Sequence, residues 1–146
     1  MKAVMISIKP EWVEKIFSGE KIMEFRKTIP NCELPCKYHI YATKPVGKVV
    51  GEFTLNYWYK FRLYEKMVSY VDTSDWQRYF CPKMSIASIK RGCVPFDQLR
   101  KYLNGKDGYA LYIDDLKKYD QPKELSEFGL TKAPQSWCYV EESEAK

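Results

Sequence analysis

Residues 19–26 read Gly19-Glu20-Lys21-Ile22-Met23-Glu24-Phe25-Arg26, and this segment sets the architecture that we expect for the chain. Apolar and charged side chains alternate within it, which predicts a strand over residues 22–27. Glu24 and Arg26 then share one face of that strand, where the two side chains can pair. Gly19 stands where the C-terminal cap of a helix belongs. The segment therefore predicts a helix that ends at a glycine and a strand with a charged face.

The preceding residues supply that helix and a first strand. Residues 3–8 alternate, with Val4, Ile6 and Ile8 on one face, and predict a strand. Pro10 suits the first position of a helix, where its missing N–H costs nothing. Apolar residues spaced four apart then form a stripe along a helix predicted over residues 11–18.

The rest of the chain predicts more strands and several helices. Further strands are expected at 38–43, 48–59, 109–113 and 136–141, and helices near 63–71, 74–80, 96–103 and 124–128; the signals between residues 58 and 93 are weak. About six strands with helices inserted between them predict a mixed α/β (α+β) fold, with the sheet closed into a small barrel. The length fits one domain over residues 1–146, with 142–146 as a solvated tail.

Composition narrows the functional classes. The net charge of +5 is compatible with a polyanionic partner, and aromatic residues make up 16% of the chain, which suits either a β-rich core or stacking surfaces for bases. We find neither a signal peptide nor an apolar run long enough for a membrane span. We therefore expect a cytoplasmic protein with reduced thiols and no membrane partner.

Several chemistries lack their residues. The glycines have no phosphate-loop spacing, and His39 is the only histidine, which is more often packed or exposed than catalytic. Cys32, Cys36, Cys81 and Cys93 could supply four thiolates to zinc. Structural zinc sites usually show two short cysteine pairs, however, and here eleven residues separate the two members of the second pair. Buried or idle thiols fit better, and we expect no cofactor and no metal.

The charged residues of the first segments form the constellation of interest. Lys21 follows the predicted cap, and Glu24 and Arg26 project from one strand face. Lys9 lies at the N-terminus of the predicted helix, where backbone N–H groups attract an anion. The spacing alone favours a solvated ion pair on an exposed strand, worth about 0–1 kcal/mol, because such groups of charged residues are common.

A family resemblance favours a functional interpretation. Gly19, Lys21, Glu24 and Arg26 match the complete signature G-x-K-x-x-E-x-R of the ASCH domain, which this chain resembles. The resemblance continues through residues 40–47, 50–53, 108–111 and 133–137, so that it spans nearly the whole chain and is weakest from 58 to 93.

The resemblance implies a fold like the PUA domain, a β-barrel with a cleft on one side, and an RNA or nucleotide partner. Lys21, Glu24 and Arg26 would line that cleft, with Lys9 nearby. By segment and chemistry, the cleft would also be bordered by Tyr41, Thr43, Lys44, Ser136 and Trp137. Arginine and lysine can hold phosphate, an aromatic ring can stack on an unpaired base, and Glu24 can accept from a base N–H.

Three functions stay open at this stage. The first is an RNA-binding module that recognises a nucleotide or a modified base in the cleft. The second is a hydrolase acting on modified nucleosides or RNA, with Lys21 and Glu24 as catalytic residues. It resembles either the amidohydrolases that deacylate a modified cytidine, whose threonine position is occupied here by Glu24, or a ribonuclease. The third is a small-molecule or nucleoside sensor that uses the same cleft. The sequence leaves the RNA and the oligomeric state unknown.

Overall fold

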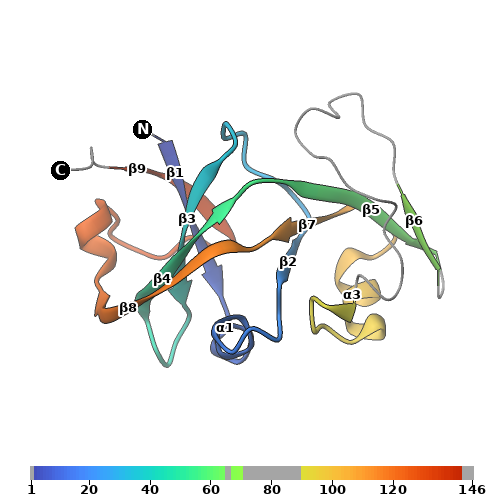
Figure 1. Ribbon diagram of the computed structural model, residues 1–146, viewed down its shortest axis with the longest axis horizontal. Helices are drawn as coiled ribbons and strands as arrows, with labels where there is room; N and C mark the ends of the chain where they lie inside the picture. Colours follow the sequence, from blue (N-terminus) through green and yellow to red (C-terminus); the bar gives the residue numbers. More distant parts are fainter. Residues whose placement is uncertain (1, 65–66, 71–89, 143–146) are drawn as a thin grey trace.

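The computed structural model describes residues 2–64, 67–70 and 90–142, and for Tyr64 and residues 67–70 it describes the backbone only. The elements in chain order are β1 (Lys2–Ile8), α1 (Pro10–Phe17), β2 (Met23–Arg26), β3 (Cys36–Ala42), β4 (Lys48–Leu55), β5 (Trp58–Tyr64), β6 (Met67–Tyr70), α3 (Phe96–Leu103), β7 (Gly108–Tyr112), β8 (Asp114–Lys123), the 3-10 helix η2 (Leu125–Phe128) and β9 (Trp137–Glu141). This arrangement confirms the predicted mixed α+β class (Figure 1).

The strands form two sheets. One has five strands in the order β8-β4-β3-β1-β9, in which β1 and β3 run parallel and the other pairs run antiparallel. The other has four antiparallel strands in the order β2-β7-β5-β6. The pairings among the described strands leave both sheets open, so the predicted closed barrel is not confirmed. Figure 1 shows why the sheets stay connected: β4 continues into β5, and β7 into β8, across the junction.

Local sequence explains the elements next to the junction. Pro10 occupies the first turn of α1 and Gly19 follows its end with a φ of +88°, a conformation that glycine adopts at little cost. Val13 and Ile16 of α1 pack on Val4, Ile6 and Ile8 of β1, in a core that also includes β3 and β4. The strand–helix–strand unit predicted from residues 3–27 is thus confirmed within a residue or two at each end.

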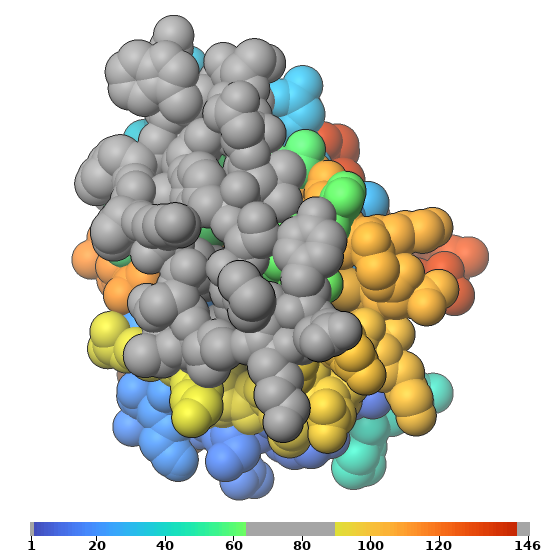
Figure 2. Space-filling view, turned by 90° about the vertical axis from the view of Figure 1, so that its right-hand side faces the viewer, coloured from blue at the N-terminus to red at the C-terminus, as the bar shows by residue number. Residues whose placement is uncertain are grey.

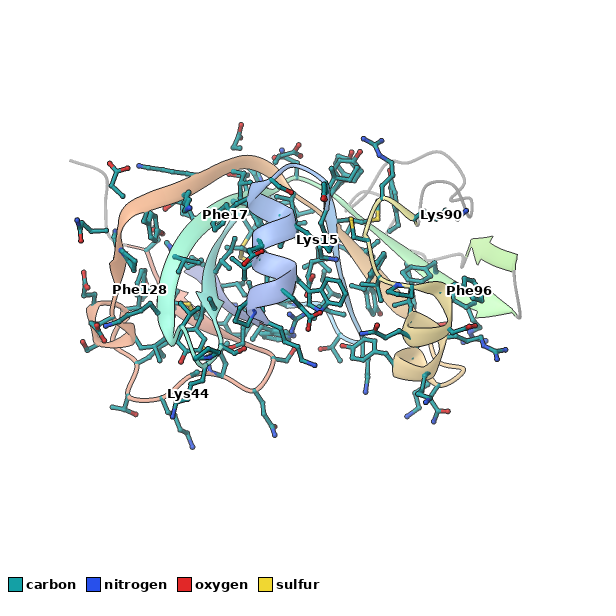
Figure 3. The ribbon with its side chains drawn as sticks, turned by 90° about the horizontal axis from the view of Figure 1, so that it is seen from below. Lys15, Phe17, Lys44, Lys90, Phe96 and Phe128 are labelled. Atoms are coloured by element: carbon teal, nitrogen blue, oxygen red, sulfur yellow. A yellow bond between two sulfur atoms is a disulfide. The ribbon has the colours of Figure 1, made fainter. Side chains whose placement is uncertain are left out.

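The second core lies under the four-stranded sheet. Met23 and Phe25 of β2 pack there with Phe61 of β5, and Leu99 and Leu103 of α3 cover them. Both α1 and α3 lie on the same side of the sheets in Figure 1, and Figure 3 shows them beside each other from below. In Figure 2 the yellow surface of α3 adjoins the blue surface of the N-terminal segment. The two helices therefore flank β2 and its charged face.

Several predictions for the middle of the chain were wrong. The strand predicted over 48–59 divides at Asn56 and Tyr57, and the helix predicted near 63–71 is replaced by the hairpin of β5 and β6 in its described part. The reason is visible in β5, where Tyr59, Phe61 and Leu63 are buried at a period of two, which suits a strand. The helix predicted near 74–80 lies outside the described residues. The helix predicted at 96–103 is confirmed as α3.

Two further corrections concern β8 and the cysteines. Residues 114–123 form a strand that was not predicted, because their polar side chains are nearly all exposed and only Tyr119 is buried. Cys32 and Cys36 form a disulfide, so the expectation of reduced, idle thiols is wrong for this pair. Bonded sulfurs cannot serve as thiolates, and no group of three or more potential metal ligands occurs in the described part of the chain.

Candidate functional site

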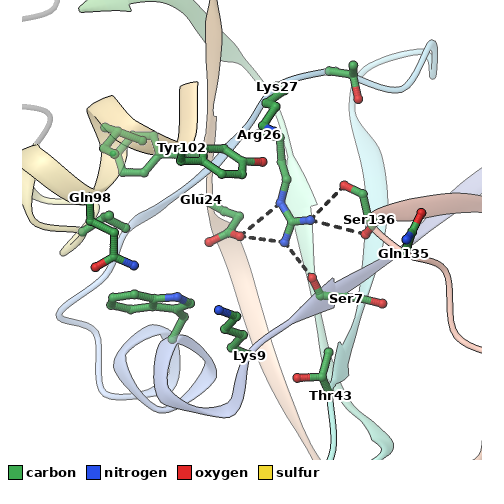
Figure 4. Close-up of a pocket in the computed structure, with 15 residues that line it drawn as sticks. Ser7, Lys9, Glu24, Arg26, Lys27, Thr43, Gln98, Tyr102, Gln135 and Ser136 are labelled. Atoms are coloured by element: carbon green, nitrogen blue, oxygen red, sulfur yellow. Dashed lines mark hydrogen bonds and ion pairs between the residues drawn. The ribbon is translucent and has the colours of Figure 1, made fainter. Parts of the chain in front are cut away.

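A cleft of about 680 Å³ opens beside the charged face of β2 (Figure 4). Its floor carries Glu24 and Arg26, and its walls come from α1 and α3. Backbone segments that are distant in sequence close the other side. They are the end of β1, the turn after β3 and the loop before β9, which contribute Ser7, Thr43, Gln135 and Ser136. The cleft thus lies where the two sheets and the two helices meet.

Glu24 is the centre of the charge network on the floor. Its Oε2 accepts hydrogen bonds from Nη2 of Arg26 at 2.7 Å and from Nε of Arg26 at 3.1 Å. Its Oε1 lies 3.3 Å from Nζ of Lys21. The Glu24 side chain is 8% exposed, and it contacts a cation on each side. Alternation along β2 places Glu24 and Arg26 on one face, as the sequence predicts.

Arg26 ties β2 to the segments across the cleft. Nη2 donates to the Ser7 carbonyl at 2.7 Å, and Nη1 donates to Oγ of Ser136 at 3.0 Å and, more weakly, to the Ser136 carbonyl at 3.4 Å. Together with the bonds to Glu24, every N–H of the guanidinium therefore has a partner inside the protein. Arg26 holds the site together and contributes its positive charge, but it has no free N–H for a bidentate contact to phosphate.

Lys21 lies beneath the cleft and is not one of its lining residues. Its side chain is fully buried, where Nζ donates to the Gly92 carbonyl and faces Glu24. Burial lowers the pKa of Lys21 below its usual range, and the nearby Glu24 carboxylate opposes that shift. Solvent reaches Glu24 and Arg26 from the cleft, whereas the Lys21 ammonium supports Glu24 from behind.

The structure divides the remaining predicted residues into two groups. Lys9, Thr43 and Ser136 line the cleft, and Lys9 is exposed. Tyr41 is buried on the opposite face of the five-stranded sheet with Met5 and Val49.

Two more residues from the same prediction also lie away from the lining. Lys44 sits in the turn after β3, on the other side of α1 from α3 (Figure 3). Trp137 donates from its indole N–H to Oγ1 of Thr28 at 3.0 Å, and its ring contacts Tyr139.

The lining residues that were not predicted from the sequence include Trp12, Gln98 and Tyr102. Trp12 of α1 packs against the core, and it also lines the cleft. Gln98 and Tyr102 come from α3. Their four-residue spacing in a predicted helix gives them a common face, which is the signal that could have identified them. No local pattern indicates that this face meets β2, since the two segments are more than seventy residues apart.

A second polar network lies on the opposite face of the five-stranded sheet. Nδ1 of His39 is 2.9 Å from the Tyr119 hydroxyl, which donates to Oε1 of Glu52 at 2.8 Å. Nε2 of His39 lies 3.0 Å from Oε1 of Glu142. His39 is 3% exposed, so the lone histidine is packed, as one of the two sequence interpretations had it. The network joins β3, β4 and β8.

Comparison with known proteins finds similarity to ASCH proteins, although no family model matches the chain. A segment of 50 residues is 46% identical to part of an ASCH domain-containing ribonuclease of Zymomonas mobilis. The segment makes up 34% of this chain and 34% of that protein. The crystal structure of ASCH from Zymomonas mobilis superposes with a TM-score of 0.70 at 26% identity, over 95% of this chain and 87% of that one. These two matches support an ASCH domain, which confirms the resemblance found in the sequence.

Another curated relative carries a different name. The large ribosomal subunit protein uL22 of Ureaplasma parvum is 33% identical over 141 residues, which are 95% of this chain but 39% of that protein. The chain spans less than half the length of the curated relatives that it matches. No helix among the described residues is long and apolar enough to span a membrane.

Proposed function

We propose that the cleft binds single-stranded or looped RNA and accommodates one unpaired nucleotide beside β2. The observation that carries the proposal is the combination of charge and ring surface in one cavity. Lys9, Arg26 and Lys27 line it against a single carboxylate, Glu24, and the rings of Trp12 and Tyr102 belong to the same lining. Cations attract the phosphate backbone, and aromatic rings stack on unpaired bases.

The exposed lysines are suited to the backbone. Lys9 and Lys27 are both exposed at the cleft, and neither forms an ion pair with another described residue. Each phosphate that such a lysine neutralises releases counterions, so that binding weakens as salt rises. The hydroxyls of Thr43 and Ser136 add short polar contacts at the same rim. The name of the Zymomonas mobilis relative, a ribonuclease, supports RNA as the class of ligand.

RNA hydrolysis is the second candidate, and the same relative favours it. Of the two catalytic residues considered from the sequence, Glu24 reaches the cleft and could accept a proton from a substrate hydroxyl. Lys21 is enclosed behind Glu24 and does not contact the cavity. Hydrolysis would therefore depend on Glu24 as the reacting group, with Lys21 as its support. The rigid, internally paired floor suits binding better than proton exchange by Lys21.

Fluorescence anisotropy with short labelled oligonucleotides tests the proposal. We expect single-stranded RNA to bind more tightly than a duplex of the same sequence, with an affinity that falls as salt rises. Electrophoresis of the same RNA after prolonged incubation tests hydrolysis, with Glu24→Gln as the comparison. Binding without cleavage supports the module, and cleavage that Glu24→Gln abolishes supports the hydrolase. Absence of binding at low salt contradicts both.

A further inference from the structure

The wall of the cleft formed by α3 presents a ring and a free amide. Gln98 and Tyr102 are four residues apart on the helix and both line the cavity (Figure 4). Tyr102 is 41% exposed, and Nζ of Lys27 lies 4.7 Å from the centre of its ring. Gln98 is exposed, and its amide has no hydrogen-bond partner among the residues that the structure describes. A helix face that combines an anchored ring with an available donor and acceptor is suited to a flat polar ligand.

Glu24 offers one more hydrogen-bonding position to the same space. A carboxylate oxygen can accept about two hydrogen bonds, and Oε2 already accepts two from Arg26. Oε1 faces Lys21 only, so it keeps one acceptor position. Figure 4 shows the Glu24 carboxylate and the Gln98 amide turned toward the same part of the cavity. An ionised carboxylate can only accept, so a ligand at this place must donate an N–H or O–H.

These groups together describe a nucleobase site. We propose that Glu24, Gln98 and Tyr102 form a subsite for an unpaired base that carries an exocyclic amino group, an inference that rests on the proposed RNA-binding function. The amino group donates to Oε1 of Glu24, and the adjacent ring nitrogen or carbonyl oxygen accepts from the Gln98 amide. Tyr102 supplies a stacking surface, as Trp12 does from α1.

The carboxylate is the group that makes the subsite selective. Cytosine presents an amino group, which donates, beside an unprotonated ring nitrogen, which accepts. This pair matches the Glu24 carboxylate as acceptor and the Gln98 amide as donor. The N–H of uracil lies between two carbonyl oxygens. A carboxylate that approaches this N–H therefore also comes close to a carbonyl oxygen, and the two acceptors repel each other. A site whose buried polar group is left facing a carbonyl loses affinity strongly. Cytosine and uracil are otherwise similar in size, which makes them the sharpest pair of probes.

The experiment compares oligocytidylate and oligouridylate of equal length by fluorescence anisotropy. We expect the wild type to prefer oligocytidylate by roughly tenfold, the scale of one discriminating base contact. Gln98→Met keeps the length of the side chain but removes both hydrogen-bonding groups, and should lower the affinity for oligocytidylate and reduce the ratio, with the remaining preference due to Glu24. Tyr102→Ala should weaken both ligands by roughly five- to hundredfold, because a base loses its stacking partner. The salt slope should not change for either variant, since no phosphate contact is lost.

Matched controls come from the surface outside the cleft. Tyr139 is 40% exposed, carries a lysine 4.0 Å from its ring centre, and accepts from the Asn31 N–H, so Tyr139→Ala repeats the truncation of Tyr102 in a similar environment. Gln121→Met repeats the amide change on β8. Both controls should retain the affinity and the ratio. RNA binding with equal affinity for the two oligonucleotides would overturn the subsite and leave the proposed function intact. Absence of RNA binding would overturn both.

Discussion

Glu24 and Arg26 meet through two hydrogen bonds to one oxygen, from Nη2 at 2.7 Å and from Nε at 3.1 Å. The other oxygen of Glu24 faces the buried ammonium of Lys21 at 3.3 Å. Two cations therefore share the single carboxylate of Glu24 before any ligand arrives. The first role of these charged residues is to fix the floor of the cleft and to link β2 with β1 and the loop before β9.

The first prediction concerns this charge network. Glu24→Gln removes the carboxylate that two cations share, and it should lower the free energy of unfolding by about 3–5 kcal/mol, as the loss of one partner from a buried pair does. Urea denaturation followed by circular dichroism measures the change. Glu124→Gln is the control, because Glu124 pairs with Lys48 at the surface, where such a pair contributes about 0–1 kcal/mol. Equal effects of the two substitutions would contradict a structural role for the network.

The second prediction concerns pH and Lys21. Burial lowers the pKa of Lys21 below its usual value of 10.5. Between the lowered and the usual pKa the folded protein binds fewer protons than the unfolded chain, so the free energy of unfolding should rise with pH. In urea denaturation between neutral pH and pH values just below 10.5, the wild type should gain stability relative to Lys21→Met. Parallel pH profiles of the two proteins would show that Lys21 does not titrate differently on folding.

The unit around the motif could be predicted because its signals are local. The alternation in β2, the proline at the start of α1 and the positive φ of Gly19 are each determined by neighbours in sequence. The shared face of Glu24 and Arg26 follows from the pleat of a strand. The disposition of Lys21 could not be predicted, since its burial depends on the Gly92 carbonyl, seventy-one residues away.

Other parts of the site depend on contacts between distant segments. Strand β8 has almost no apolar pattern, because it is an edge strand that pairs with β4 through its backbone. Tyr41 was predicted at the cleft from its segment. Its side chain instead lies on the opposite face of β3 and packs with Val49. Only the pairing of β2 with β7, and the position of α3 beside them, bring Tyr102 to the cavity.

The third prediction concerns the cysteines. Cys32 and Cys36 are bonded, so reduction of the denatured protein should expose two thiols more than denaturation alone. Closing so short a loop should stabilise the fold by about 2 kcal/mol in the chain-entropy model. A thiol titration with and without reductant counts the groups, and thermal unfolding under the same two conditions measures the stability. The double variant Cys32→Ser, Cys36→Ser should show no dependence on reductant from this pair. An unchanged thiol count would contradict the disulfide.

The last prediction separates the two lysines of the site by a matched substitution. Lys9 is exposed at the cleft, whereas the Lys21 side chain is enclosed, so only Lys9 can approach a phosphate. Lys9→Met should weaken RNA binding and reduce the slope of log affinity against log salt by about one, the value for one lost phosphate contact. Lys21→Met should leave that slope unchanged, with any loss of affinity traced to the unfolded fraction seen by circular dichroism. Anisotropy at several salt concentrations, at a temperature where both variants remain folded, makes the comparison. A reduced slope for Lys21→Met would mean that the ammonium reaches the ligand, and that the floor of the cleft opens when RNA binds.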